Sequence, residues 1–256
     1  MEYPFDVLHA DIESQILGLP SGIPDSDAVR QARALPPTAE HYAVLGKALS
    51  RQLRYREAIE SYSAGLTLEP ENLPLLRLRA GRYLTTLQSD RAIRDFEGCL
   101  ALGAERLDCL YRMGLAYFYA GCYREALAQW EACMPLCDDE MGIAVLYWHT
   151  LCSARAGRQP ALLQQYHTGM AVGHHTAYEK AMRVWSGEAQ WLPVLQELEK
   201  ADDLEYSIGV YGLLWHPDCK NRESLREELL RRDGVWPSFA YLAAWNDAHR
   251  AGENQA

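Results

Sequence analysis

The sequence lacks any apolar run approaching the ~20 residues that a membrane-spanning helix requires. Its first residues, 1–6, are acidic and lack the basic start and apolar stretch of a secretory signal peptide. Neither glycine nor proline is abundant enough to indicate a disordered chain. We therefore expect a folded cytoplasmic protein that does not bind membranes.

The chain also has no excess of basic charge. Its 25 Lys and Arg residues stand against 35 Asp and Glu, so the formal net charge is -10. Phosphate repels such a surface, which argues against nonspecific binding of nucleic acid or anionic lipid. Residues 41–112 differ, with eleven Lys and Arg against nine Asp and Glu. The sequence thus allows a local basic patch within an acidic protein.

Cysteine spacing gives no indication of a disulfide framework. The chain has seven cysteines, an odd number, and most lie on apolar helical stripes. This usage is typical of small buried residues in a reducing compartment. The cysteines are Cys99, Cys109, Cys122, Cys133, Cys137, Cys152 and Cys219.

What the sequence does contain is a repeat of 34 residues, in windows that begin at Ala39, Leu73 and Leu107. Small residues recur at positions 8 and 20, and an aromatic residue recurs at position 24. The residues are Gly46, Ala80 and Gly114 at position 8, Ala58, Ala92 and Ala126 at position 20, and Tyr62, Phe96 and Trp130 at position 24. Both halves of each window carry apolar residues at helical spacing, which predicts two helices per repeat.

This pattern resembles the tetratricopeptide repeat (TPR) family. The resemblance implies an all-α solenoid of antiparallel helix pairs, in which the small residues let paired helices approach closely. The aromatic residue at position 24 would fill the space toward the next repeat. The resemblance also implies a protein–protein interaction scaffold, not an enzyme, with a concave groove lined by the first helix of each repeat.

The repeat divides the chain into six expected segments. They are an N-terminal helical cap (1–38), three repeats (39–72, 73–106 and 107–140), a degenerate fourth repeat (143–176) and a Trp-rich helical region (177–256). The fourth repeat would turn at Gly157 and place Tyr166 at position 24. This repeat requires two inserted residues in the preceding loop, and it is degenerate because Thr150 and Leu162 replace the small residues.

The N-terminal segment predicts two short helices. The first would carry the apolar residues Phe5, Leu8, Ile12 and Ile16 on one face, and Asp25 or Ser26 would cap the second. We expect this segment to cover the apolar end of the first repeat, as solenoids require. The alternative is that it lies in the groove and competes with a partner.

The C-terminal segment predicts helices over residues 175–186, 189–200, 203–215, 221–232 and 237–250. Five of the seven tryptophans fall here, namely Trp185, Trp191, Trp215, Trp236 and Trp245. Core packing in divergent helix pairs is the favoured interpretation. The alternative is an exposed aromatic patch through which the protein forms a homodimer.

Placing the family's groove positions on this sequence gives eight candidate peptide-binding residues. They are Lys47, Arg51, Arg77, Tyr111, Phe118, Tyr119, Tyr147 and Arg155. The first three make one half of the groove cationic, and the aromatic residues line the other half. Such a groove suits a protein or peptide partner with an acidic end and apolar side chains. The alternative is that the C-terminal helices cover the aromatic residues.

One specialised binding mode of the family is not expected. TPR domains that hold the acidic tails of heat-shock chaperones carry a clamp of Lys and Asn at positions 5 and 9 of the first repeat, Asn at position 9 of the second, and Lys and Arg at positions 5 and 9 of the third. The corresponding residues here are Ala43, Lys47, Gly81, Tyr111 and Leu115, so the clamp is absent.

No phosphate-binding loop, nucleophile elbow or zinc-protease motif appears, so we expect no catalytic residues and no cofactor. The Cys133-x3-Cys137 pair and the adjacent His174 and His175 raise a metal-site hypothesis. However, Cys133 occupies repeat position 27, which packing explains, so we expect no metal site. An unrecognised enzyme or metal-binding protein is the third alternative.

Overall fold

The computed structural model describes residues 9–253. Over this range the chain consists of α-helices and short 3-10 helices without any β-strand, which confirms the predicted all-α fold. The chain divides into two compact units at the junction of Glu105 and Arg106, here called the N-terminal and C-terminal units. Within the described range, no helix has both the length and the hydropathy needed to span a bilayer.

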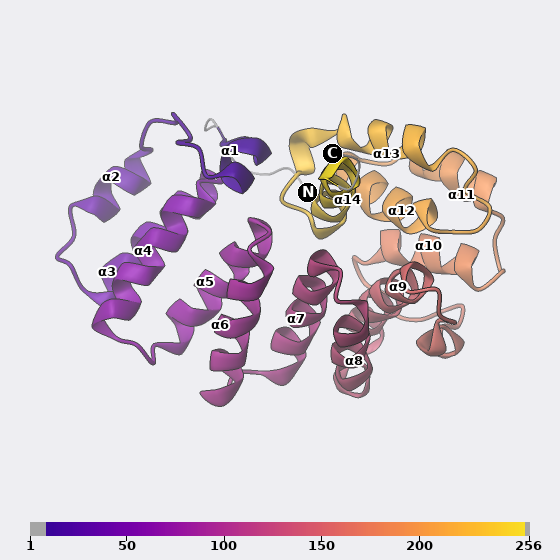
Figure 1. The fold of residues 1–256 in the computed structure, drawn as a ribbon, viewed down its shortest axis with the longest axis horizontal. Coiled ribbons are helices and arrows are strands. Elements are labelled where there is room, and N and C mark those ends of the chain that lie inside the picture. The colour runs from indigo at the N-terminus through magenta and orange to yellow at the C-terminus, as the bar shows by residue number, and fades with distance from the viewer. Residues whose placement is uncertain (1–8, 254–256) are drawn as a thin grey trace. The chain divides into compact units, whose positions relative to one another are not determined.

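The N-terminal unit contains six helices within its described residues (Figure 1). They are α1 (Ile12–Leu17), α2 (Asp27–Arg33), α3 (Ala39–Arg51), α4 (Tyr55–Leu68), α5 (Leu73–Thr85) and α6 (Ser89–Ala101). Side-chain caps set several starts: Thr38 accepts a hydrogen bond from the His41 amide, and Asn72 accepts one from the Leu75 amide. Helices α3 and α4 form one antiparallel pair, and α5 and α6 form the next.

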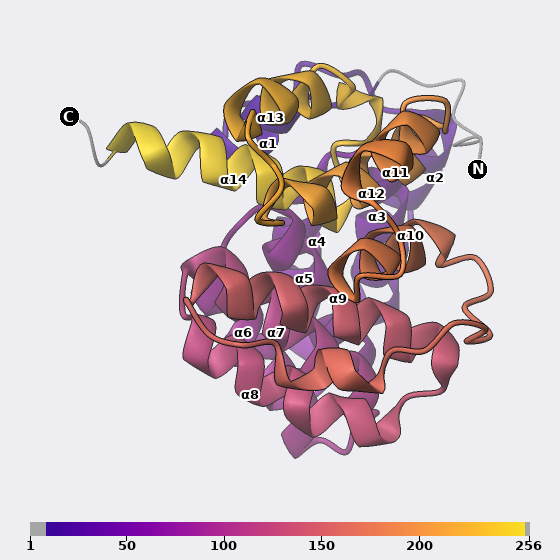
Figure 2. The ribbon, with the colours of Figure 1, turned by 90° about the vertical axis from the view of Figure 1, so that its right-hand side faces the viewer.

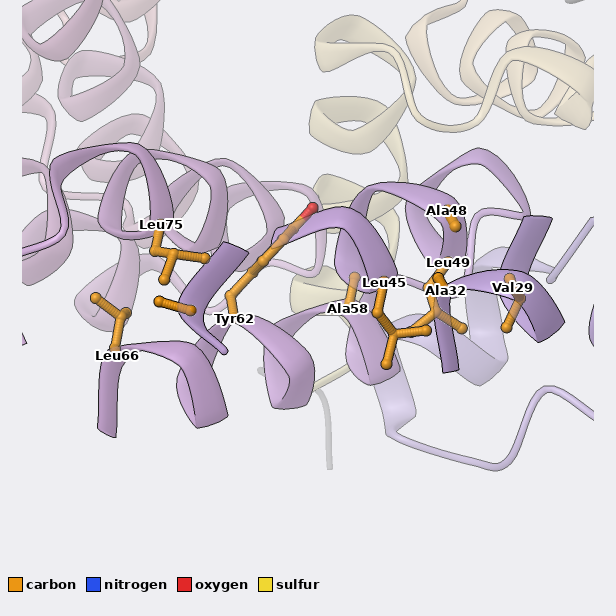
Figure 3. Close-up of a cluster of buried hydrophobic side chains, with 10 residues drawn as sticks. Val29, Ala32, Leu45, Ala48, Leu49, Ala58, Tyr62, Leu66 and Leu75 are labelled. Atoms are coloured by element: carbon orange, nitrogen blue, oxygen red, sulfur yellow. The ribbon is translucent and has the colours of Figure 1, made fainter. Parts of the chain in front are cut away.

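The helix pairs are held by the small and aromatic residues of the repeat. Gly46 on α3 lies directly against the ring of Tyr62 on α4, where even a Cβ atom would overlap the ring. Ala58 is fully buried beside them, and Leu75 extends the same core onto α5 (Figure 3). The contacts are those that the TPR pattern predicts for positions 8, 20 and 24.

Each predicted turn between the paired helices contains one residue with a positive φ angle. Leu53 (φ 57°) and Leu87 (φ 54°) take this role in the first two repeats, and Gly121 (φ 77°) takes it in the third. All three stand at position 15 of their windows. Glycine adopts this left-handed conformation without steric cost, whereas leucine does not. The turn geometry thus recurs even where the residue type does not.

Helix α2 packs against α3 and contributes Val29 and Ala32 to the core of the first helix pair. A buried guanidinium joins the same segment to α4: Arg54 bonds to Asp25 at 2.7 Å and to Glu57 at 2.6 Å. Burial raises the pKa of the Asp25 carboxyl, but its contacts with Arg33 and Arg54 outweigh burial and hold that pKa below its usual value. Residues 26–33 therefore pack on α3 and extend the core of the first pair.

Of the apolar residues expected on the first short helix, Ile12 and Ile16 lie on α1. Phe5 and Leu8 lie outside the described residues. Arg56 fixes α1 by donating to the carbonyl oxygens of Gln15, at 2.6 Å, and Ile16.

The C-terminal unit contains eight α-helices within its described residues (Figure 2). They are α7 (Arg106–Ala120), α8 (Tyr123–Cys133), α9 (Asp139–Arg155), α10 (Thr176–Trp185), α11 (Trp191–Leu198), α12 (Asp203–Leu214), α13 (Arg222–Leu230) and α14 (Phe239–Glu253). Short 3-10 helices cover Met134–Leu136, Ala161–Gln165 and Asp233–Val235. Helices α7 and α8 form the third repeat pair, in which Gly114 lies against the ring of Trp130.

Helix α9 is the central element of the C-terminal unit. Residues 142–153 are buried on every side, as expected of a helix that is apolar all round. The second helix expected after Gly157 is replaced by the 3-10 helix Ala161–Gln165 and a loop. Gly157, Gly169 and Gly173 adopt positive φ in this segment, and such glycines interrupt a helix. The expected fourth repeat thus lacks its second helix. Helix α9 packs on α8 and α10 instead.

The five helices expected after residue 174 are confirmed as α10 to α14, with ends that differ by a few residues. Helix α14 contacts α7, α12 and α13. Residues 240–245 of α14 are all buried. The last helix is therefore part of the core of the C-terminal unit.

Candidate functional site

The cationic candidates lie in the N-terminal unit. Lys47 and Arg51 stand one turn apart on α3, and Arg77 stands on α5. All three side chains are exposed. Their orientation follows from the helix period, because Leu45, Gly46 and Leu49 occupy the buried side of α3. We call Lys47, Arg51 and Arg77 the cationic surface.

Two of these charges have no ion-pair partner among residues 9–250. Lys47 and Arg51 form no ion pair there, whereas Arg54 and Arg79 of the same unit each bind a carboxylate. Arg79 forms a two-pronged contact with Asp95, at 2.7 and 2.9 Å. The N-terminal unit thus uses some arginines to join its helices and leaves the α3 cations facing solvent.

The surroundings of the cationic surface are partly apolar and open. Val44 is 42% exposed on α3, next to Lys47 in the helix lattice. Pro74 is exposed on α5, one turn before Arg77. A Cβ atom at Gly81 would meet nothing within 4 Å, so the α5 surface is uncrowded there. A carboxylate with short apolar neighbours fits this combination.

The aromatic candidates lie in the C-terminal unit and are buried. Tyr111, Phe118 and Tyr119 on α7 are 7%, 2% and 2% exposed, and Tyr147 on α9 is fully buried. The Tyr119 hydroxyl donates to the Phe239 carbonyl at 2.9 Å, and Asn246 donates to the Tyr119 carbonyl at 2.9 Å. Helix α14 thus covers the face of α7 that carries Tyr111 and Tyr119.

Tyr147 is held in a similar way from α12. Its hydroxyl donates to the Ile208 carbonyl at 2.6 Å, and its ring packs edge-on against Tyr178. Gly212 of α12 makes this approach feasible, because a Cβ atom there would lie 2.6 Å from the Tyr147 ring. The C-terminal helices therefore cover the aromatic candidates, as the alternative interpretation of the sequence held.

Arg155, the last candidate, is part of a buried polar network. Its guanidinium bonds to Asp247 of α14 at 2.6 Å and lies over the rings of Phe118 and Trp215. The Tyr211 hydroxyl donates to the other Asp247 oxygen at 2.9 Å. Burial raises the pKa of Asp247 despite the Arg155 charge beside it, so this carboxylate is held at a desolvation cost. The network joins α9, α12 and α14.

Sequence reasoning missed the carboxylate that Arg155 binds. Asp247 stands in a segment where the repeat register is lost, so no spacing rule connected the two residues. The available signal was a single acidic residue two positions after the apolar run from Phe239 to Trp245, on the same predicted helix. An acid in that position needs a buried partner.

The tryptophans of the C-terminal region are largely packing residues. Trp236 and Trp245 are 5% and 9% exposed. The indole nitrogens of Trp185 and Trp191 donate to the carbonyls of Gly212 and Leu213, at 3.0 and 3.1 Å. Trp185 and Trp191 also line a surface hollow of about 780 Å³ beside His216 and the exposed Leu192.

Among the described residues, three side chains form a group that could hold a metal ion: Glu140, His174 and His175. The Cys133 thiol is buried instead and directed at the Leu107 carbonyl. The two histidines thus group with a glutamate of α9, not with the cysteine pair.

Neither a protein-family model nor a curated protein matches the sequence. Among solved structures, the chain is similar to YrrB, described as a TPR protein with an unusual peptide-binding site. The identity is 12%, the TM-score is 0.46, and the alignment covers 88% of this chain and 100% of YrrB. The fold described above follows from the helix pairs themselves and not from this likeness.

Proposed function

We propose that this protein is an interaction scaffold and not an enzyme, and that it binds a protein or peptide at the cationic surface of α3 and α5. The observation that carries the proposal is the exposure of Lys47 and Arg51 without an ion-pair partner among residues 9–250. Two such cations one turn apart keep their hydrogen-bond donors available for a ligand.

The chemistry of this surface favours an acidic ligand. Arginine presents a planar fork of donors that binds a carboxylate with two hydrogen bonds, and Lys47 adds a third cation. Val44 and Pro74 offer apolar contact beside the charges. The proposed partner is therefore a peptide with a carboxylate-rich end followed by small apolar side chains. The aromatic candidates contribute to the C-terminal core and take no part.

A fluorescence-polarisation assay tests the proposal with a labelled acidic peptide, such as one ending in Val-Asp-Glu-Glu with a free carboxylate. The matched variants are the double change Arg51→Ala and Arg77→Ala, and the single change Arg94→Ala at an exposed arginine on α6. We expect the double variant to bind at least tenfold more weakly at low salt, because a charge-assisted contact is worth about 1–3 kcal/mol.

Three further results decide between this site and nonspecific attraction. Arg94→Ala should retain the wild-type affinity, binding should weaken with added salt, and a peptide of the same length with lysines in place of the acids should not bind. Equal affinities of the wild type and the double variant would refute the cationic surface as the site. Equal losses in the double and Arg94 variants would indicate nonspecific charge attraction.

Self-association through the C-terminal region is the second candidate, favoured by the exposure of Leu192 (56%) beside the hollow at Trp185 and Trp191. It has less support, because both indole nitrogens already bond to carbonyls of α12.

A further inference from the structure

Two adjacent histidines meet a glutamate at the start of α9. Glu140 lies in the first turn of this helix, and His174 and His175 immediately precede α10. The Nδ1 atom of His174 lies 2.5 Å from Oε1 of Glu140. One nitrogen of each imidazole and one carboxylate oxygen all lie within 4.8 Å of one another.

The backbone of the loop before α10 also contacts the start of α9. The proximity of the three side chains therefore does not depend on their rotamers alone. The Ala171 amide donates to the Asp139 carboxylate at 2.9 Å. Gly173 adopts φ +53°, and a Cβ atom there would lie 2.6 Å from the Glu140 carboxylate. The positive φ favours glycine at this position, and the absence of a side chain leaves room for the Glu140 carboxylate beside it. Residues 171–175 therefore lie against the start of α9.

His175 is oriented by the same helix. Its Nδ1 atom lies 2.6 Å from the Glu140 carbonyl oxygen, and its ring packs edge-on against Tyr178. A carbonyl accepts, so Nδ1 carries the proton and Nε2 keeps its lone pair. Metal-binding histidines are commonly set in this way, with one nitrogen bonded to a carbonyl and the other to the metal.

Two imidazoles and one carboxylate form a donor set typical of zinc. Zinc binds nitrogen and carboxylate oxygen at about 2.0–2.2 Å in a tetrahedron, which places ligand atoms about 3.3–3.6 Å apart. In the present structure His174 Nδ1 lies 2.5 Å from Glu140 Oε1, and all three ligand atoms lie within 4.8 Å of one another. The His174 side chain is 73% exposed, so its imidazole can rotate to adjust these separations. Nitrogen ligands also favour zinc, nickel and copper over magnesium and calcium.

We propose that Glu140, His174 and His175 bind a divalent transition metal ion, with zinc as the preferred ion. Three protein ligands leave the fourth position to water or to a donor from another molecule. Bound metal would fasten the loop that contains Gly169 and Gly173 to α9. This site is separate from the cationic surface and does not depend on the proposed function.

The competing explanation is an ordinary ion pair between protonated His174 and Glu140. Cobalt titration of the full chain, followed by absorption spectroscopy, separates the two explanations. We expect one Co²⁺ ion to bind per chain with visible d–d bands and without the near-ultraviolet band of thiolate-to-cobalt charge transfer. Zinc should displace the cobalt. The absence of a thiolate band excludes the seven cysteines as ligands.

The variants are His174→Ala and Glu140→Gln, which alter exposed or half-buried side chains and keep the Glu140 carbonyl. The matched control is His167→Ala, an exposed histidine of the same loop outside the group. We expect each site variant to weaken Co²⁺ and Zn²⁺ binding at least tenfold, and the control to bind as the wild type does.

Thermal unfolding gives a second readout that needs no spectrum. A metal that binds the folded state raises Tm with concentration, and this rise should disappear in His174→Ala while its metal-free Tm stays near the wild-type value. Three results would overturn the proposal: a strong thiolate band, equal affinity of His174→Ala and the wild type, or no Co²⁺ or Zn²⁺ binding at millimolar concentration.

Discussion

At the scale of single residues, the fold depends on small side chains opposite large rings. Gly46 meets Tyr62 in the first repeat, and Gly114 meets Trp130 in the third, in two copies of the same contact. The sequence predicted these contacts because a 34-residue period fixes which residues of two paired helices face each other. The rings are buried whether the neighbouring small residue is glycine or alanine, as Phe96 beside Ala80 shows.

Replacing Gly114 by alanine should therefore destabilise the protein even though alanine favours helices. The added Cβ atom would overlap Trp130, which is fully buried and whose indole nitrogen donates to the Tyr111 carbonyl. Overpacking of this kind costs about 1–3 kcal/mol, and urea unfolding followed by circular dichroism measures it. The matched control is Gly81→Ala, where a Cβ atom meets nothing within 4 Å. It should be neutral or stabilise by up to about 1 kcal/mol. Equal stability of the two variants would contradict the packing argument.

The candidate site was predictable in one half only. Lys47 and Arg51 lie on a helix face away from Leu45 and Leu49, and an unpaired charge stays in water, so their exposure follows from the sequence. The burial of Tyr119 could not be predicted in this way, because a tyrosine on a helix face can either bind a ligand or pack under another helix. Its cover, α14, begins 120 residues later, at Phe239. No repeat register relates those two positions.

At the scale of elements, the sequence predicted the helices where the period holds and missed the segment where it fails. The helices of the first three repeats and the later helices α10 to α14 were expected. A second helix of the fourth repeat (143–176) was expected after the turn at Gly157, because Tyr166 fits position 24 of the repeat. Three glycines with positive φ, Gly157, Gly169 and Gly173, interrupt that helix, and the Gly173 backbone lies against the Glu140 carboxylate of α9. Such tertiary contacts leave no periodic trace.

The ion pair between Arg155 and Asp247 joins α9 to α14, and its removal should loosen the C-terminal unit. Asp247→Ala leaves Arg155 charged among aromatic rings with no carboxylate partner. Breaking one side of a buried pair costs about 3–5 kcal/mol, which urea unfolding followed by tryptophan fluorescence would measure. The control is Glu228→Ala, which breaks an exposed pair with Arg231 on α13 and should change stability little. If Asp247→Ala costs no more than the control, the ion pair with Arg155 does not stabilise the position of α14.

At the scale of the whole molecule, the two units differ in composition. All seven tryptophans lie after Arg106, and Trp130 and Trp148 are fully buried in the C-terminal unit. The described part of the N-terminal unit has a smaller aromatic core, in which Tyr62 and Phe96 are the large rings with at most 1% exposure. Tryptophan fluorescence therefore reports only on the C-terminal unit, whereas far-ultraviolet circular dichroism reports helices in both.

This difference predicts two unfolding transitions in urea. We expect the N-terminal unit to unfold first, because large buried aromatic side chains dominate the burial energy available to thin helical layers. Circular dichroism should then fall in two steps, and tryptophan fluorescence should change only in the second. Two-state unfolding requires different probes to give coincident transitions, so this mismatch is diagnostic. Hydrogen exchange at intermediate urea supplies the assignment: amides of α3 to α6 should exchange while those of α9 stay protected. Superimposable curves from both probes would show instead that the chain unfolds as one cooperative unit.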